Sequence, residues 1–526
     1  MKDFYERNDQ LINSDVNKTF DELLVMTDDE FKSWVREMRN EVRRIWDELG
    51  CPPRVGINEP DIIKQFNKLE GFPIHELITK DELTGDNDVL ANNKRVGTAV
   101  NQWFPTMMKT RILYGKDPSK AKSIYDWFVE EDLFERQVNF ARRNFKRDSF
   151  YHFAPVVRRG NLEENLILAD TGKEWIEKFE ERIRPHNEYS YWIDPCDSIE
   201  VYTGYSSSMK ESKFLSITRT EAIEMNKEGI IPDHALANLY TKDDEICRIR
   251  LFKKGQKIFP VGFKSFRVTY CQYAVNFPPV IAKFLYQTYT EDIKNQDVIN
   301  IWDPSAGWAG RLLGAISVKD DRQIHYIGTD PNTDHNLPNG KTKYDSVAEF
   351  YNTKTNRAND ALFEPVLNTH KIFQCGSEVV KDNPEFQKYK GELDFVFTSP
   401  PYFAKEIYSE DEAQSCHKFS TYADWRDNFL YPTLKTAVEY LKEDRYMAWN
   451  IADAVFDNVT LPMEKDSIDY LESLGMKYIK TWKMKLAQMP GGNRVGEDGK
   501  PTAKNFCKVN GKWFKYEPIF IFKKMK

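Results

Sequence analysis

The stretch DFVFTSPPYF, residues 394–403, places two prolines and a tyrosine directly after an apolar run. Proline has no backbone N–H to donate to a sheet ladder, so Phe395–Phe397 can be a buried strand only if that strand ends by about Ser399. The sequence therefore predicts a rigid loop at the carboxyl end of a strand. In open α/β sheets, ligands bind at such strand ends.

A second strand with a distinctive end is predicted about 90 residues upstream of that loop. Val298–Trp302 reads as a strand, DPSAGWAG (303–310) as a turn of small residues, and the sequence from about Arg311 as a helix. Small residues let a backbone approach a ligand closely, and the first turn of a helix presents free N–H groups. The glycine spacing is neither the dinucleotide fingerprint nor a Walker A loop.

Two further strands are predicted between these, and each leads to ligand-competent residues. The strand predicted in QIHYIGTDPN (323–332) ends in Asp330, whose carboxylate can accept both hydroxyls of a ribose. HKIFQCGSE (370–378) ends in Ser377 and Glu378. Strands alternate with helical patterns past residue 276, which predicts an α/β fold with a mainly parallel sheet and crossover helices.

The chain has 526 residues, which favours two to four domains. Residues 1–190 read as mainly helical, with helices expected at 28–50 and 59–72, and 191–275 as a β-rich segment. We expect residues 276–526 to form the α/β domain.

Composition favours a soluble globular protein, with 40% hydrophobic and 30% charged residues. No run reaches the roughly 18 apolar residues that a membrane span needs. The first ten residues are polar and acidic, so we expect no signal peptide and a cytoplasmic protein. The seven cysteines are scattered without zinc spacing, so we expect reduced thiols and no metal site.

One stretch in the N-terminal half combines positive charge with aromatic residues, although the net charge of the whole chain is −7. Residues 135–159 carry seven Lys/Arg, among them Arg142, Arg143 and Arg147, against two acidic residues, and aromatic residues interleave with them. Phosphate contact combined with base stacking uses this mixture. A solvated helix whose aromatic residues face the core explains it equally well. We take the three arginines as candidate DNA contacts.

The combination of motifs from about residue 276 to 524 resembles the S-adenosylmethionine-dependent DNA amino-methyltransferases. Their signature after the fourth strand is Ser/Asn/Asp-Pro-Pro-Tyr/Phe/Trp, which residues 399–402 match. DPSAGWAG resembles the family's cofactor loop, Asp-Pro-Phe-x-Gly-x-Gly, with Ser305 in place of the Phe and Ala309 in place of the second Gly. NFPPVIAKFLYQTY (276–289) resembles the segment that helps to hold the methionine part of the cofactor.

The resemblance implies a Rossmann-like class I methyltransferase domain with a mainly parallel seven-stranded sheet, and S-adenosylmethionine as cofactor. The cofactor-binding residues that we predict from it and from the strand ends are Phe277, Pro278, Asp303, Pro304, Ala306, Gly307, Gly310, Asp330, Ser377 and Glu378. The predicted catalytic residues are Ser399, Pro400, Pro401 and Tyr402.

By the same resemblance, the substrate is double-stranded DNA with the target base flipped out of the helix. Ser at the first position is commoner among N4-cytosine enzymes, so N4-cytosine is favoured and N6-adenine is the alternative. Many phage-borne and orphan methyltransferases have these motifs. A catalytically inactive DNA-binding or scaffold protein with the same fold is the remaining alternative.

Overall fold

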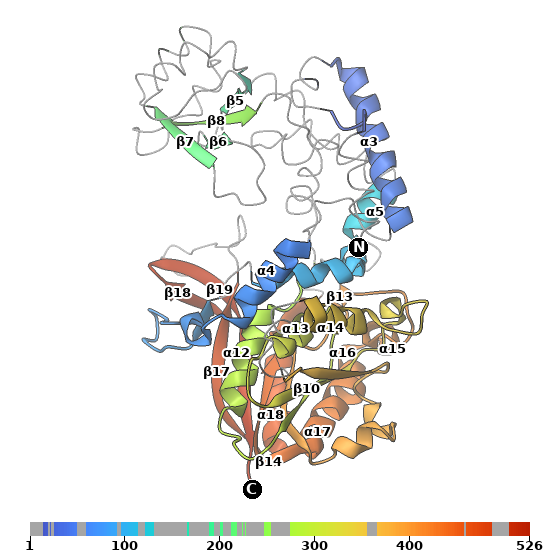
Figure 1. Cartoon of the computed structure of the whole chain (residues 1–526), viewed down its shortest axis with the longest axis vertical. Coiled ribbons are helices and arrows are strands. Elements are labelled where there is room, and N and C mark those ends of the chain that lie inside the picture. Colours follow the sequence, from blue (N-terminus) through green and yellow to red (C-terminus); the bar gives the residue numbers. More distant parts are fainter. Residues whose placement is uncertain are drawn as a thin grey trace. The chain divides into compact units, whose positions relative to one another are not determined.

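The computed structural model describes the chain as two compact units, one formed by Met1–Gly56 and Ser123–Gln272, the other by Ile57–Lys122 and Tyr273–Lys526 (Figure 1). The residues that it describes are 14–18, 22, 26–49, 59–91, 96–113, 121–130 and 274–526, the last range without 355–365, 457–458 and 487–503, together with short strands and isolated positions between 131 and 273.

The first unit contains the long helix α3 (Asp28–Leu49), predicted at 28–50. Its apolar stripe is buried at helical spacing: Trp34, Met38, Val42, Ile45 and Trp46. Helix α5 (Ile124–Val129) contacts α3 and begins with a capping box formed by Ser123 and Asp126. A five-stranded sheet has the order β4 (Leu166–Ile167), β5 (Tyr189–Ile193), β8 (Cys247–Lys253), β6 (Glu200–Tyr202), β7 (Ser212–Ile217).

The second unit is built on a ten-stranded sheet. Its strand order is β1 (Ile78–Thr79), β2 (Val89–Ala91), β17 (Met476–Lys485), β19 (Lys512–Lys524), β14 (Leu441–Asn450), β12 (Leu393–Thr398), β9 (Val298–Asp303), β10 (Gln323–Thr329), β11 (Thr369–Phe373), with β18 (Phe506–Val509) paired to β19.

Strands β11, β10, β9, β12 and β14 run parallel, and β19 lies antiparallel between β14 and β17. The predicted mainly parallel α/β sheet is confirmed, and seven neighbouring strands run from β17 to β11; β1, β2 and β18 are additional to the seven predicted. The strand order reverses between β9 and β12, which makes their carboxyl ends the topological switch point where such sheets bind ligands.

Helices cover both faces of this sheet, which explains why every residue of β12 is buried. Phe395 and Phe397 contact the ring of Tyr286 in α12, while Val396 belongs to the core cluster that also contains residues of α17 and α18. The longer helices of this unit are α4 (Glu59–Glu70), α12 (Pro279–Thr290), α13 (Gly310–Ile316), α14 (Lys343–Lys354), α17 (Tyr431–Tyr440) and α18 (Met463–Ser473).

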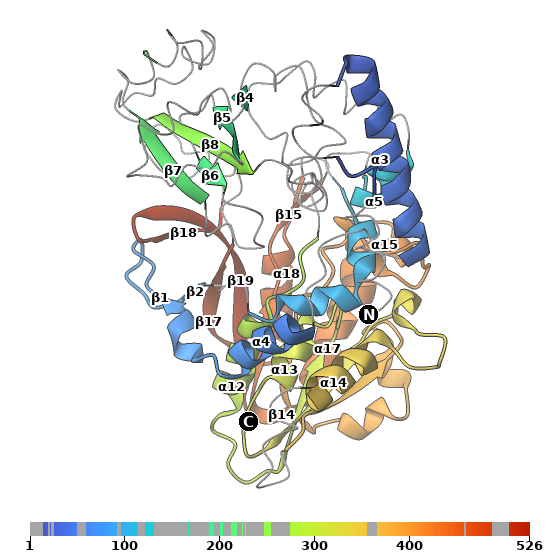
Figure 2. The same ribbon diagram turned by 45° about the horizontal axis from the view of Figure 1, so that its top comes forward.

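Residues 57–122, which the sequence analysis placed in the N-terminal region, belong to the compact unit of the sheet. β2 pairs with β17 in parallel and α4 contacts α14 (Figure 2). A three-residue strand has no readable periodicity, so the sequence alone did not place this segment.

A second difference concerns β11, which ends at Phe373. Ser377 and Glu378 therefore lie in the loop after the strand and not at its end.

In the part of the chain that the structure describes, no helix has the length and apolar character needed to cross a membrane.

Candidate active site

The ends of β9, β10 and β12 meet around Asp303, the last residue of β9. Its side chain is fully buried and accepts hydrogen bonds from Arg311 Nε (2.7 Å), Tyr326 OH (2.5 Å), Thr398 Oγ1 (2.7 Å) and the Ser305 N–H (3.1 Å). A carboxylate offers about four acceptor sites, and here all four are used. Asp303 therefore holds the surrounding loop in place, and a ligand would contact it only by displacing one of these donors.

Arg311, which the sequence analysis treated only as a helix start, closes the loop 303–310 from its far end. Its guanidinium is buried, bonds Asp303 and the Ser305 carbonyl, and lies 5.6 Å from the ring centroid of Phe277. A buried charge is tolerated when it is paired in this way. The signal that could have revealed Arg311 is its place in the first turn of a helix, eight residues after the acidic residue Asp303.

Two glycines of the loop have different roles. Gly307 has φ +57°, and a Cβ there would meet nothing closer than 3.6 Å, so this backbone is open to a ligand. At Gly310 a Cβ would lie 2.2 Å from the Phe277 carbonyl oxygen and 2.5 Å from Asn276 Oδ1. Gly310 is therefore required for packing against the chain itself, and its predicted contact with a cofactor is not what explains the glycine.

Neighbouring predicted residues hold the same loop on the sheet. The Ala306 N–H donates to the Thr329 carbonyl (2.9 Å), and the Pro304 carbonyl accepts from Thr329 Oγ1 (2.6 Å). Phe277 is buried with its ring edge-on to Phe397 at 5.1 Å, and Pro278 caps α12.

Asp330 follows β10 directly, as predicted, and is nine-tenths buried. Its carboxylate accepts from the Asn332 N–H (2.8 Å) and Tyr344 OH (2.6 Å), and His335 Nδ1 lies 3.5 Å away. Burial raises the pKa of Asp330. The charge of His335 and the hydrogen bonds from His335, Tyr344 and the Asn332 N–H lower it by more, so the pKa of Asp330 lies below its usual value. Tyr344 OH also lies 2.5 Å from the Gly307 carbonyl, which ties this carboxylate to the loop 303–310.

Glu378 is buried, and one of its two carboxylate oxygens accepts no hydrogen bond from the described residues. Its Oε1 pairs with Lys418 Nζ at 2.5 Å, whereas Oε2 has no hydrogen-bond partner among the described residues. Leaving such an acceptor unsatisfied is costly, so a donor from a ligand would stabilise it. Ser377, by contrast, shares a hydrogen bond of 2.8 Å with Thr433 of α17.

The predicted catalytic loop leaves the sheet at Thr398, next to Asp303. Pro400 is buried, and Ser399, Pro401 and Tyr402 are half-buried. The next residue, Phe403, has φ +49° and a ring buried among aromatic side chains of the core. A bulky residue rarely adopts this conformation, and such strain is typical of functional sites.

Tyr402 turns its hydroxyl into the protein. Burial raises its pKa well above the usual value, and the charges of Glu517 (β19) and Glu406 raise it further. Glu406 belongs to β13 (Glu406–Ile407), which pairs with β3 (Arg111–Ile112). The predicted stacking of Tyr402 on a base therefore concerns the part of the ring that remains exposed.

Glu406 and Glu517 are residues that the sequence analysis missed. Burial raises the pKa of Glu517 to about 7, with a contribution from Glu406, and burial raises that of Glu406 as well. Tyr408 OH donates to Glu406. The local sequence around these carboxylates has no signal that places them beside residues 399–402.

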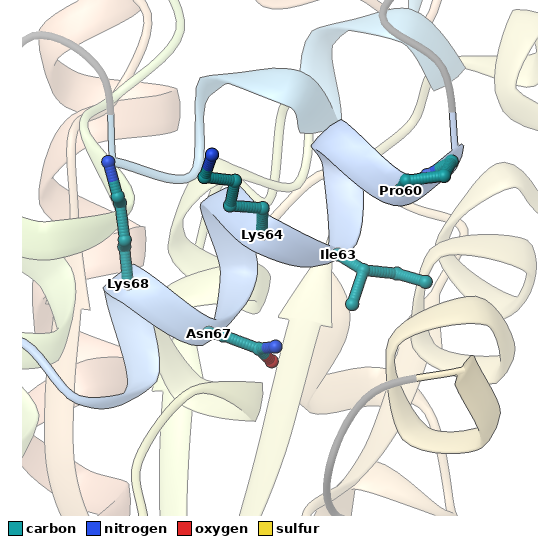
Figure 3. A pocket seen from close by; sticks show the side chains of 5 residues that line it. All are labelled: Pro60, Ile63, Lys64, Asn67 and Lys68. Carbon is teal, nitrogen blue, oxygen red and sulfur yellow. The ribbon is translucent and has the colours of Figure 1, made fainter.

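Two other features complete the account of the predicted residues and of the hollows in the described part of the chain. The predicted DNA contacts Arg142, Arg143 and Arg147 lie outside the described residues. A hollow of about 620 Å³ runs along α4, lined by Pro60, Ile63, Lys64, Asn67 and Lys68 (Figure 3), and contains none of the predicted site residues.

No family model matches the sequence, and no curated protein matches it. Solved structures that are similar include a putative class I S-adenosylmethionine-dependent methyltransferase from Listeria monocytogenes (14% identity, TM-score 0.26), which covers 47% of this chain and 59% of its own. TrmN from Thermus thermophilus has 10% identity over 47% of this chain and 49% of its own, with a TM-score of 0.24. A putative DNA modification methylase, also from Thermus thermophilus, has 16% identity over 28% and 50%, with a TM-score of 0.18. The chain thus spans about half to three fifths of the length of these three structures.

Proposed function

We propose that the chain is an S-adenosylmethionine-dependent methyltransferase that modifies the exocyclic amine of a flipped base in double-stranded DNA. The observation that carries the proposal is the contact between its two signature loops. Thr398, which immediately precedes Ser399, hydrogen-bonds Asp303 at the start of the small-residue loop. A base held by residues 399–402 would thus lie beside a cofactor held by residues 303–310. Ser399 favours N4-cytosine, and N6-adenine is the alternative.

The residues of the site fit the proposed cofactor. Gly307 offers an open backbone, Asp330 a charged carboxylate for ribose hydroxyls, and Glu378 Oε2 a buried acceptor for an amine or hydroxyl. When bound, the cofactor would supply a methyl group activated on a sulfonium.

The chain's own task is then to activate the target amine and to exclude water from it. That amine is a poor nucleophile because its lone pair is delocalised into the ring. Ser399 and the Pro400 carbonyl would accept its N–H groups and draw the nitrogen toward tetrahedral geometry. Proline fixes the carbonyl dipole before the reaction, so no reorganisation is needed. The amine is out of reach in a paired helix, which is why the base must be flipped.

The test is transfer of labelled methyl groups to unmethylated duplex DNA, followed by mass analysis of the nucleosides. N4-methylcytosine is the expected product, and N6-methyladenine would support the alternative. Cofactor binding without any methylated nucleoside would reject DNA as the substrate. Absence of cofactor binding by calorimetry would favour the inactive scaffold.

A further inference from the structure

The hairpin of β18 and the first part of β19 has two faces of different chemistry. Cross-strand partners are Phe506 with Lys515, Cys507 with Phe514, Lys508 with Trp513, and Val509 with Lys512. Partners that lie directly opposite share a face, and successive pairs alternate between faces. The ribbon lies beside β1 and β2 at the end of the sheet (Figure 2).

One face anchors the hairpin. Cys507 and Val509 are buried against Val89 of β2, with Phe514 and Tyr516 packed around them. The Glu82 N–H donates to the Lys508 carbonyl (2.8 Å), and the Lys508 N–H donates to Asp81 Oδ1 (3.1 Å). Folding of the hairpin is therefore accounted for by this face alone.

The other face, which we call the basic-aromatic face, consists of Phe506, Lys508, Trp513 and Lys515. Lys515 is exposed and the other three are half-buried. The ammonium of Lys508 lies 5.9 Å from the ring centroid of Trp513. Residues 504–516 contain four lysines and no acidic residue, in a chain whose net charge is −7.

This face continues into the predicted catalytic loop. Glu517 lies two residues beyond Lys515 on β19 and therefore on the same side of the strand. Thr398 of β12 lies opposite Trp449 of β14, and Asn450 of β14 lies opposite Ile519 of β19. Residues 512–517 of β19 therefore lie at the carboxyl edge of the sheet, where residues 399–402 leave β12.

We propose that the basic-aromatic face binds the DNA strand that flanks the flipped nucleotide, with Lys508 and Lys515 on phosphates and Trp513 and Phe506 stacked on bases. The inference rests on the proposed function, because it needs the target base at residues 399–402. Flipping leaves the neighbouring bases without their normal stacking partner, and half-exposed aromatic rings beside lysines suit such bases. The face's positive charge complements the phosphate backbone.

The experiment measures binding of a labelled DNA duplex to the full chain by anisotropy over a range of salt concentrations. Lys508→Ala with Lys515→Ala should lower the affinity and reduce the slope of log affinity against log salt by about 1.4 to 1.8, since each phosphate contact contributes roughly 0.7 to 0.9. Trp513→Ala should lower the affinity by about 5- to 150-fold, and Trp513→Phe should keep most of it. The matched control is Lys512→Ala, because Lys512 is exposed on the same hairpin but on the anchoring face.

The outcomes separate this inference from the proposed function. If the parent binds DNA and the double lysine variant keeps the affinity and salt slope of the Lys512→Ala control, the basic-aromatic face is not the binding surface, while the proposed function stands. An equal loss in the control and in the double variant would also reject the face. If the parent binds no DNA at all, the proposed substrate itself is wrong. Thermal melting of each variant identifies any loss that comes from unfolding.

Discussion

The hydroxyl of Thr398 donates a hydrogen bond of 2.7 Å to Asp303, and this joins the ends of two neighbouring parallel strands, β12 and β9. Both residues are fully buried. The bond couples the loop predicted to hold a base to the loop predicted to hold a cofactor, so a change at one loop reaches the other through a single contact.

Thr398→Val removes this donor while it keeps the shape of the side chain. The buried carboxylate of Asp303 then lacks one partner, which should lower the free energy of unfolding by about 1 to 3 kcal/mol, as measured by chemical denaturation. Thr369→Val is the matched control, because Thr369 is exposed and hydrogen-bonds His325. If both substitutions lowered the free energy of unfolding equally, the buried hydrogen bond to Asp303 would contribute no more to stability than the exposed one at Thr369.

Asp330→Ala tests the predicted ribose contact. Loss of a charge-assisted hydrogen bond costs roughly 1.5 to 3 kcal/mol, so the affinity for S-adenosylmethionine should fall by about ten- to a hundredfold in calorimetry. Asp334→Ala removes an exposed acid four residues away and should leave the affinity unchanged. An unchanged dissociation constant for Asp330→Ala would remove this carboxylate from the cofactor site.

Ala309 occupies the place of the family's second glycine and keeps a glycine-like backbone, with φ 58° and ψ 16°. A Cβ is unfavourable in this left-handed region, so Ala309→Gly should increase the stability by up to about 1 kcal/mol. Ala315→Gly, within helix α13, should instead lower the stability, because glycine is unfavourable inside a helix. Denaturation midpoints give both values, and a destabilised Ala309→Gly variant would contradict the assignment of strain.

Tyr402→Ala should reduce methyl transfer sharply in single-turnover assays, since stacking on a base is worth about 1 to 3 kcal/mol. Ser399→Ala should lower turnover more than DNA affinity, because the proposed hydrogen bond between Ser399 and the target amine stabilises most when positive charge develops on the amine nitrogen. Both should still bind the cofactor. Tyr402→Phe is the control that keeps the ring. If both alanine variants methylate at the parent rate, residues 399–402 only end a strand.

Glu517 predicts how stability depends on pH. Its pKa rises from the ordinary 4.5 to about 7 through burial and the neighbouring Glu406, with Lys515 opposing. A carboxyl group whose folded pKa is raised stabilises the fold in its protonated form, so this contribution is present below pH 4.5 and is lost as the pH rises to about 7. The melting temperature should therefore fall across this window. Glu517→Gln should flatten that decline, and an unaltered pH profile would contradict the assignment.

The sequence by itself determined four neighbouring parallel strands of the sheet, β9, β10, β11 and β12, and the loops that follow them. β12 was predicted because its apolar run ends before Pro400 and Pro401, which cannot continue a strand. β9 was predicted because its apolar run leads into the small-residue turn DPSAGWAG, residues 303–310. The place of Asp330 directly after β10 was predicted for the same local reason, since a strand's last residue is readable from its own pattern.

Only the tertiary structure decided which of these residues remain available to a ligand. Asp303 reads as a ligand residue, yet four donors saturate it, and two of them, Thr398 and Tyr326, come from other strands. Gly310 reads as a ligand-binding glycine, yet Phe277 occupies the space beside it. Hydrogen bonds and close packing between residues far apart in the chain have no periodicity, so no local pattern predicts them.

The same reason explains the segments that the sequence misplaced or missed. β2 joins the sheet through pairing with β17, almost 400 residues later in the chain, and three residues are too few to show an alternation. Glu517 lies at the carboxyl edge of the sheet, where residues 399–402 leave β12, only because β19 runs antiparallel to β14. Strand direction and order are set by how the layers pack, and that packing is what the tertiary structure adds to the sequence.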